Sequence, residues 1–224
     1  MNYAYVMDFS WIAEYYPRFI YAALLTLKLT LITAAASFVI GLIAGQMRMA
    51  RNIFIRIPSA AYIDFFRTTP LLVQVVFFFF FLPLFLGMRA DAWTAGILAL
   101  SLNYGAFFAE IFRAGVGSLD RGQSEAALAI GMTPVQSLRR VIYPQAIRRM
   151  VPPIGSMFVS LLKDSSLVSI LGVPELMNTA QNVGSITFRN IEVLFFVAMI
   201  YFVLTYPMVL FANRLHKRSN TWAH

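Results

Sequence analysis

Apolar residues in this chain fall into long runs that are separated by short polar or basic segments. Crossing the hydrocarbon core of a bilayer takes about 20 residues of α-helix, so runs of this length predict membrane-spanning helices. We place five spans at residues 19–47, 71–86, 93–112, 153–171 and 191–212. The pattern therefore predicts an all-α integral membrane protein with five transmembrane helices.

The segments between the spans divide the rest of the chain. Residues 1–18 are aromatic-rich and weakly acidic, and we expect an interfacial segment on the outer face. Residues 19–213 are expected to form a single transmembrane domain, and residues 214–224 a basic cytoplasmic tail. Residues 58–69 mix apolar and charged side chains, which fits either the membrane interface or the protein interior. Residues 175–190 are polar and are predicted to be an outer loop.

Composition agrees with a membrane protein. The chain is 59% hydrophobic and 12% charged, whereas roughly 25% of the residues in soluble domains are charged. No long polar segment remains from which a second, soluble domain could be built. There are no cysteines, and both histidines lie in the tail, which argues against disulfides and against thiol or histidine metal sites.

Basic residues set the expected orientation. The net charge is +8, but most basic residues flank apolar runs, which favours a role in orienting the protein over nucleic-acid binding. Three lie on one side of the bilayer, namely Arg18, Arg89 and Arg189. Twelve lie on the other side: Arg48, Arg51, Arg56, Arg113, Arg121, Arg139, Arg140, Arg148, Arg149, Arg214, Lys217 and Arg218. Because cytoplasmic loops carry the excess of Lys and Arg, we expect the N-terminus outside and the C-terminus inside.

Residues 121–149 are polar and basic although they lie between apolar runs. We predict a short helix over residues 123–130 that Gly131 ends, since glycine is common just past a helix. Thr133 and Pro134 then have the pattern of a cap and first-turn proline, which predicts a second short helix. Two such helices form a compact loop that is too polar to lie in lipid, and the orientation set by the basic residues places it on the cytoplasmic side.

Polar side chains also occur inside two predicted spans. We expect Asn103, Tyr104, Ser160, Lys163, Asp164 and Ser165 to line a pathway near the middle of the membrane. Ionisable groups within a membrane are costly and by default indicate function. The alternative is that Lys163 and Asp164 form a structural pair. Adjacent residues on a helix point about 100° apart, which makes such a pair difficult to form.

The loop carries a spacing that resembles a known motif. Glu125-Ala126-Ala127, then Gly131, then Val141-Ile142-Tyr143-Pro144 is similar to the EAA loop of permease subunits in binding-protein-dependent ABC importers. That pattern is Glu-Ala-Ala, three residues, Gly, nine residues, Ile, one residue and Leu-Pro. Val141 replaces the isoleucine and Tyr143 the leucine. Residues 109–115 and 163–167 further resemble the polar amino acid branch of this family.

The resemblance implies a set of partners. Two permease subunits, identical or related, would pair around a central pathway in the bacterial cytoplasmic (inner) membrane. A periplasmic or surface binding protein would deliver the amino acid. Two cytoplasmic ATPase subunits would dock on the loop, at the residues Gln123, Ser124, Glu125, Ala126, Ala127, Gly131, Met132 and Thr133.

ATP chemistry is expected elsewhere than on this chain. The sequence has no G-x-x-x-x-G-K-[ST] phosphate loop, so the hydrolysis of ATP with Mg²⁺ is assigned to the partner ATPase and no cofactor or metal to this chain. For a zwitterionic substrate, Asp164 would bind the ammonium group, and Lys163 or hydroxyls the carboxylate. Lys163 favours glutamate or aspartate, followed by glutamine.

Two other functions are compatible with a polytopic membrane protein. An ion-gradient-driven secondary transporter usually shows repeated halves, and the sequence has no evident repeat. A non-transporting scaffold that recruits a cytoplasmic partner would not need charged residues at mid-membrane, so Lys163 and Asp164 disfavour it.

Overall fold

The computed structural model describes residues 7–87 and 91–220 of the chain. Three parts of the sequence-based predictions lie outside these ranges. They are residues 1–6 of the predicted outer segment, residues 221–224 of the predicted tail, and Arg89, which was counted among the basic residues of the outer side. Within them the chain is helical and contains no strand. The all-α prediction is confirmed.

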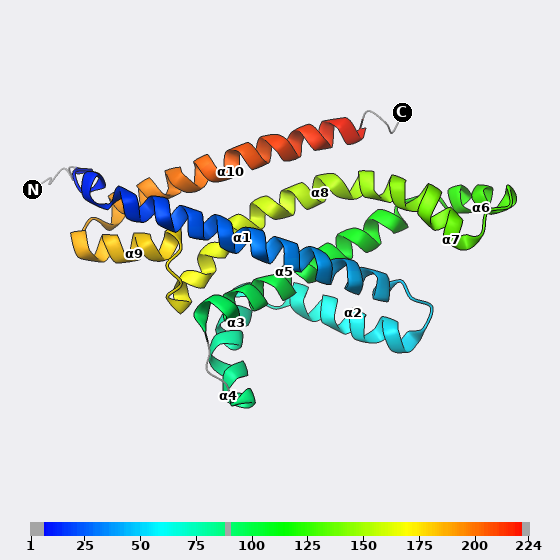
Figure 1. Ribbon diagram of the computed structural model, residues 1–224, viewed down its shortest axis with the longest axis horizontal. Coiled ribbons are helices and arrows are strands. Elements are labelled where there is room, and N and C mark those ends of the chain that lie inside the picture. The colour runs from blue at the N-terminus through cyan, green and yellow to red at the C-terminus, as the bar shows by residue number, and fades with distance from the viewer. Residues whose placement is uncertain (1–6, 88–90, 221–224) are drawn as a thin grey trace, which may run out of the picture.

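Four long helices of the described chain are apolar enough to cross a membrane. They are α1 (Ile12–Arg48), α5 (Ala92–Gly117), the helix over Pro134–Leu171, and α10 (Asn190–Asn220), in which Asn190–Arg214 is the candidate span. The helix over Pro134–Leu171 comprises α7 (Pro134–Ser137), the π-turn η2 (Leu138–Ile142), α8 (Tyr143–Asp164) and the 3₁₀ segment η3 (Ser165–Leu171). In Figure 1, α1, α8 and α10 run along the length of the molecule.

A sharply bent pair of helices takes the place of the predicted span at residues 71–86. The chain bends by 108° between α2 (Ile53–Thr68) and the arm made of α3 (Leu71–Val76), η1 (Phe77–Phe81) and α4 (Leu82–Leu86). The predicted span is thus one arm of a broken element. Thr69 is extended at φ −92° and ψ 143°, because the ring of Pro70 disfavours the helical region for the residue before it.

α2 also settles the question left open for residues 58–69. The Ser59 hydroxyl donates a hydrogen bond to the carbonyl of Ala44 at 2.6 Å, and the Tyr62 hydroxyl donates to the carbonyl of Leu102 at 2.7 Å. Ile63 is fully buried. One side of α2 therefore packs on the protein interior, against α1 and α5.

Three predicted boundaries differ in the structure. α1 begins at Ile12, so residue 18 marks no break between an interfacial segment and the first span. The predicted outer loop at residues 175–190 is mostly a helix, α9 (Leu176–Thr187), whose N-cap is Glu175. α10 continues to Asn220, well into the segment predicted as a tail. α1 and α10 are thus longer than the apolar runs that predicted them, and α9 lies outside any such run.

Small residues let α1 and α5 lie close together. A Cβ placed on Gly41 would collide with the Cβ of Phe108, and one on Gly45 would come within 2.9 Å of the Phe112 ring. Glycines four residues apart allow such an approach between membrane helices. The resulting contact, which Figure 1 shows along the middle of the molecule, places α5 where it can line a site together with α8.

Candidate functional site

The loop beginning at Arg121 folds as a helix, a glycine corner and a second helix start. α6 (Arg121–Ala129) ends where the backbone of Gly131 takes φ +86°, a left-handed conformation that glycine adopts without strain. Thr133 is the N-cap of the next helix and forms a capping box with Gln136. Pro134 lies in the first turn of that helix. The predicted corner is confirmed. The second helix is not short, however, because it continues without interruption into the span that ends at Leu171.

The residues predicted to couple to an ATPase gather on this corner. Glu125, Ala126, Gly131 and Thr133 are exposed, whereas Ala127 is buried. The Gln145 amide donates to the Gln123 side-chain carbonyl at 3.3 Å, which ties α6 to α8. Ser124 and Met132 are half-buried.

The glycine corner also carries exposed apolar side chains. Ile130 is 76% exposed and Val135 71% exposed, on the two sides of the glycine corner. Leu128 is exposed as well. Exposed apolar groups that lie together on a polar rim mark sites of protein contact. The corner can therefore act as a docking surface.

A second site is a pocket of about 330 Å³ between α5, α8 and the bend after α2. It is lined by Arg67, Thr69, Leu71, Asn103, Tyr104, Phe107, Met157, Ser160 and Asp164. Four of the six predicted pathway residues are thus brought together, namely Asn103, Tyr104, Ser160 and Asp164. Ligand pockets combine apolar walls with convergent polar groups. Here Leu71, Phe107 and Met157 supply the apolar part.

Two predicted pathway residues do not line the pocket. Lys163 is exposed and lies outside the pocket wall, and Ser165 is buried and donates its hydroxyl to the carbonyl of Leu162 at 2.7 Å. The Lys163–Asp164 pair considered from the sequence is not among the ion pairs of the described residues. The partner of Asp164 is instead Tyr104, whose hydroxyl donates to the carboxylate at 2.6 Å.

Charges of both signs meet at the pocket. Asp164 is half-buried on one wall. Arg67 enters from the end of α2, where its guanidinium lies 5.5 Å from the centre of the Phe107 ring and 3.8 Å from Glu110. Glu110 also pairs with Arg113, as the spacing of these residues predicts. A pocket with a guanidinium and a carboxylate can hold a molecule that carries both a negative and a positive group.

Amide side chains hold the bend that supplies Arg67 and Thr69. Asn103 donates to the carbonyl of Phe66 at 2.9 Å and to the Gln74 side-chain oxygen at 3.0 Å. Gln74 in turn donates to the Thr69 hydroxyl at 2.6 Å. A broken helix leaves backbone groups without helical partners, and within a membrane these must be satisfied by protein. Asn103 thus serves the shape of the pocket as well as its lining.

Arg67 and Thr69 were not among the predicted pathway residues. They belong to the segment whose position the sequence left open, and only the bend brings them to α5 and α8. Among the described residues, no cluster of three or more His, Cys, Asp or Glu side chains could hold a metal ion.

The chain resembles several known proteins. Residues 37–221 match the family described as "Binding-protein-dependent transport system inner membrane component". The glutamine transport system permease protein GlnP of Escherichia coli (strain K12) is 36% identical over 215 residues, covering 95% of this chain and 98% of that protein. The probable glutamine ABC transporter permease protein GlnM of Bacillus subtilis (strain 168) is 39% identical over 193 residues, covering 86% and 89%.

Solved structures show the same fold. A crystal structure of an amino acid ABC transporter with histidines superposes with a TM-score of 0.90 at 37% identity, covering 96% of this chain and 100% of that one. An inward-facing structure of the MetNI methionine ABC transporter superposes at 0.77 with 22% identity, over 92% of this chain and 98% of that one. The second likeness concerns the fold alone.

Proposed function

The chain belongs to the binding-protein-dependent transport system inner membrane components, as a permease subunit of an amino acid ABC importer, and we propose that it carries glutamine through the pocket between α5 and α8. The observation that carries the proposal is that Arg67 and Asp164 line the same pocket. The guanidinium binds the α-carboxylate of the substrate, and the Asp164 carboxylate binds its ammonium group.

The lining groups left for the substrate side chain are neutral, which favours glutamine over an acidic amino acid. The sequence-based preference for glutamate or aspartate depended on Lys163, which does not line the pocket. Thr69, Asn103 and Ser160 remain for the substrate side chain, and these groups match an amide better than a second carboxylate. The relatives named above as glutamine permeases support the same order.

Transport is driven from the loop at residues 121–149. A partner ATPase docks on the corner around Gly131 and binds ATP and Mg²⁺ itself. The helix over Pro134–Leu171 begins at this corner and includes Ser160 and Asp164, so that a displacement of the corner reaches the pocket through a single helix. A second permease subunit and a substrate-binding protein complete the importer, in the bacterial inner membrane with the N-terminus outside.

The proposal can be tested in proteoliposomes that contain the permease, its ATPase and its binding protein. Glutamine uptake is measured with and without internal ATP, and with glutamate, aspartate and arginine as competitors. We expect ATP-dependent uptake that falls by about tenfold to a hundredfold in Asp164→Asn and Arg67→Gln, since hydrogen bonds between charged groups contribute about 1.5–3 kcal/mol. Lys163→Gln is the matched control and should retain uptake.

Two results would contradict this function. Uptake that needs an ion gradient and no ATPase would indicate the secondary transporter considered from the sequence. A complex that binds an ATPase but never takes up an amino acid would indicate the scaffold.

A further inference from the structure

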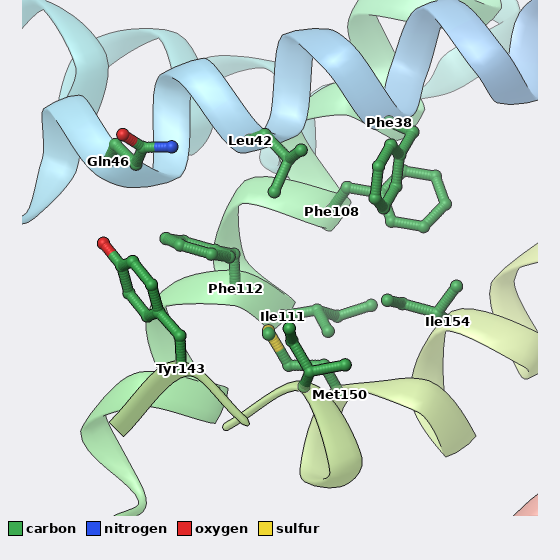
Figure 2. Close-up of a pocket in the computed structure, with 10 residues that line it drawn as sticks. Phe38, Leu42, Gln46, Phe108, Ile111, Phe112, Tyr143, Met150 and Ile154 are labelled. Carbon is green, nitrogen blue, oxygen red and sulfur yellow. The ribbon is translucent and has the colours of Figure 1, made fainter. Parts of the chain in front are cut away.

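An apolar groove runs between α1 and α8 at the end of the molecule that carries the loop. It has a volume of about 360 Å³ and is separate from the pocket that holds Asp164. Phe38 and Leu42 of α1 form one wall, and Met150 and Ile154 of α8 form the other. Phe108 and Phe112 of α5 lie between the walls, as Figure 2 shows.

Polar atoms are confined to one end of this groove. Gln46 and Tyr143 carry the nitrogen and oxygen atoms of the lining side chains, and Figure 2 shows both at the same end, opposite Phe38 and Ile154. Gln46 lies two residues before the last residue of α1, Arg48. The polar end thus faces the membrane surface at the loop side, and the apolar end extends toward the middle of the bilayer.

Basic residues continue the polar end. Arg139 and Arg140 lie about one helical turn before Tyr143, on the side of the loop. Both are exposed, and the ion pairs among the described residues do not include either of them. Arg51 follows α1 and is exposed at the same end of the molecule. Arginines at the mouth of a groove between membrane helices attract lipids with anionic head groups.

We propose that this groove binds an anionic phospholipid of the inner leaflet. One acyl chain lies along Leu42, Phe108 and Ile154, and the phosphate lies near Tyr143, within reach of Arg139 and Arg140. The order of the groups along the groove, from apolar through polar to cationic, is the order along a phospholipid from acyl chain to head group. Only the choice of leaflet rests on the orientation proposed above.

The test is a direct count of retained lipid. The purified importer is equilibrated with equal amounts of phosphatidylglycerol and phosphatidylcholine, and native mass spectrometry then measures the lipid that stays bound to each permease chain. We expect about a thirtyfold preference for phosphatidylglycerol, since each arginine near a membrane surface contributes about 1 kcal/mol to anionic lipid binding. Arg139→Gln together with Arg140→Gln should abolish this preference.

Groove filling provides the second arm. Leu42→Phe, or Ile147→Phe at the exposed rim should the first variant fail to assemble, should lower the retained lipid about tenfold. Val203→Phe, on the exposed surface of α10, is the matched control and should change nothing.

Three outcomes would overturn the inference. They are retention of both lipids alike by the unaltered protein, undiminished retention by the filled variants, and an efficient cross-link from Ile147→Cys to a second permease chain. The readout needs neither substrate nor ATP, so its failure is distinct from a failure of the proposed transport function.

Discussion

The hydroxyl of Tyr104 donates a hydrogen bond of 2.6 Å to the carboxylate of Asp164, across 60 residues of sequence. The bond joins α5 to α8 at the wall of the pocket, and it fixes the position of the one pocket carboxylate. It also explains how a carboxylate inside a membrane protein is stabilised without the neighbouring Lys163.

Removal of this hydrogen bond tests the position of the carboxylate. Tyr104→Phe keeps the buried ring and loses only the donor. We expect the KM for glutamine uptake to rise about tenfold, because a hydrogen bond to a charged group contributes about 1.5–3 kcal/mol. The measurement is initial uptake into proteoliposomes. Tyr206→Phe on the exposed side of α10 is the control. An unchanged KM in Tyr104→Phe would argue that Asp164 takes no part in substrate binding.

The glycine corner provides a test of coupling. Gly131 has φ +86°, and a Cβ there would meet nothing within 4 Å, so a substitution adds backbone strain without a clash. Gly131→Val should cost about 1–2 kcal/mol or more and distort the corner. We expect normal membrane insertion but ATP hydrolysis that no longer drives uptake, measured as the ratio of the two rates.

The control for the corner is Gly117→Val. A Cβ at Gly117 also has nothing within 4 Å, and Gly117 does not have the positive φ of Gly131. An unchanged ratio in Gly131→Val would count against the coupling role of the loop.

Glu175 makes stability depend on pH. Its carboxylate is fully buried, where it accepts hydrogen bonds from the amides of Met177 and Asn178 and from the Tyr201 hydroxyl. Burial raises the pKa of Glu175 from 4.5 to about 7, against the opposing effect of these donors. The folded state therefore binds the proton more tightly than the unfolded state, and the free energy of unfolding falls as pH rises from about 4.5 to about 7.

The loss should reach up to about 3 kcal/mol, measured by unfolding in detergent across this pH range. Glu175→Gln should flatten the dependence, whereas Glu14→Gln, at an exposed position of α1, should preserve it. An identical pH profile in Glu175→Gln would assign the dependence to other groups.

The close packing of α1 on α5 can be tested by the addition of one methyl group at Gly41. Gly41→Ala places a methyl group against Phe108 and the carbonyl of Gly105, and we expect a loss of about 1–3 kcal/mol in stability. The loss should appear as a lower thermal unfolding midpoint in detergent. Gly117→Ala, at a site with open space, is the control. Equal midpoints would mean that the two helices can separate without cost.

The long spans could be predicted because their length and apolar character are local properties. α9 was missed because its exposed side is polar, although Leu176, Ala180 and Val183 are buried at the spacing of one helical face. That stripe was present in the sequence and could have identified the helix. Its N-cap was harder to find, since the preferred caps are Ser, Thr, Asp and Asn, and Glu175 is none of these.

The pocket was predicted in part for a geometric reason. Ser160 and Asp164 are four residues apart and share one face of α8, where they meet Tyr104. Lys163 is turned about 100° from Asp164, and spacing alone cannot tell which of two adjacent residues faces inward. Arg67 depends on the bend at Thr69 and Pro70, which is a tertiary feature and could not be read from periodicity.

The bend has a consequence for biogenesis. α2 has 16 residues and so extends only about 24 Å, which is less than the roughly 30 Å of the hydrocarbon core. The carbonyl of Phe66, exposed by the bend, receives its hydrogen bonds from Gln74 and Asn103. Asn103 leaves the ribosome after both arms of the bend. The bend after α2 therefore reaches its final shape only once α5 has been synthesised and inserted. This part of the permease thus completes its folding after a later segment of the chain has been made.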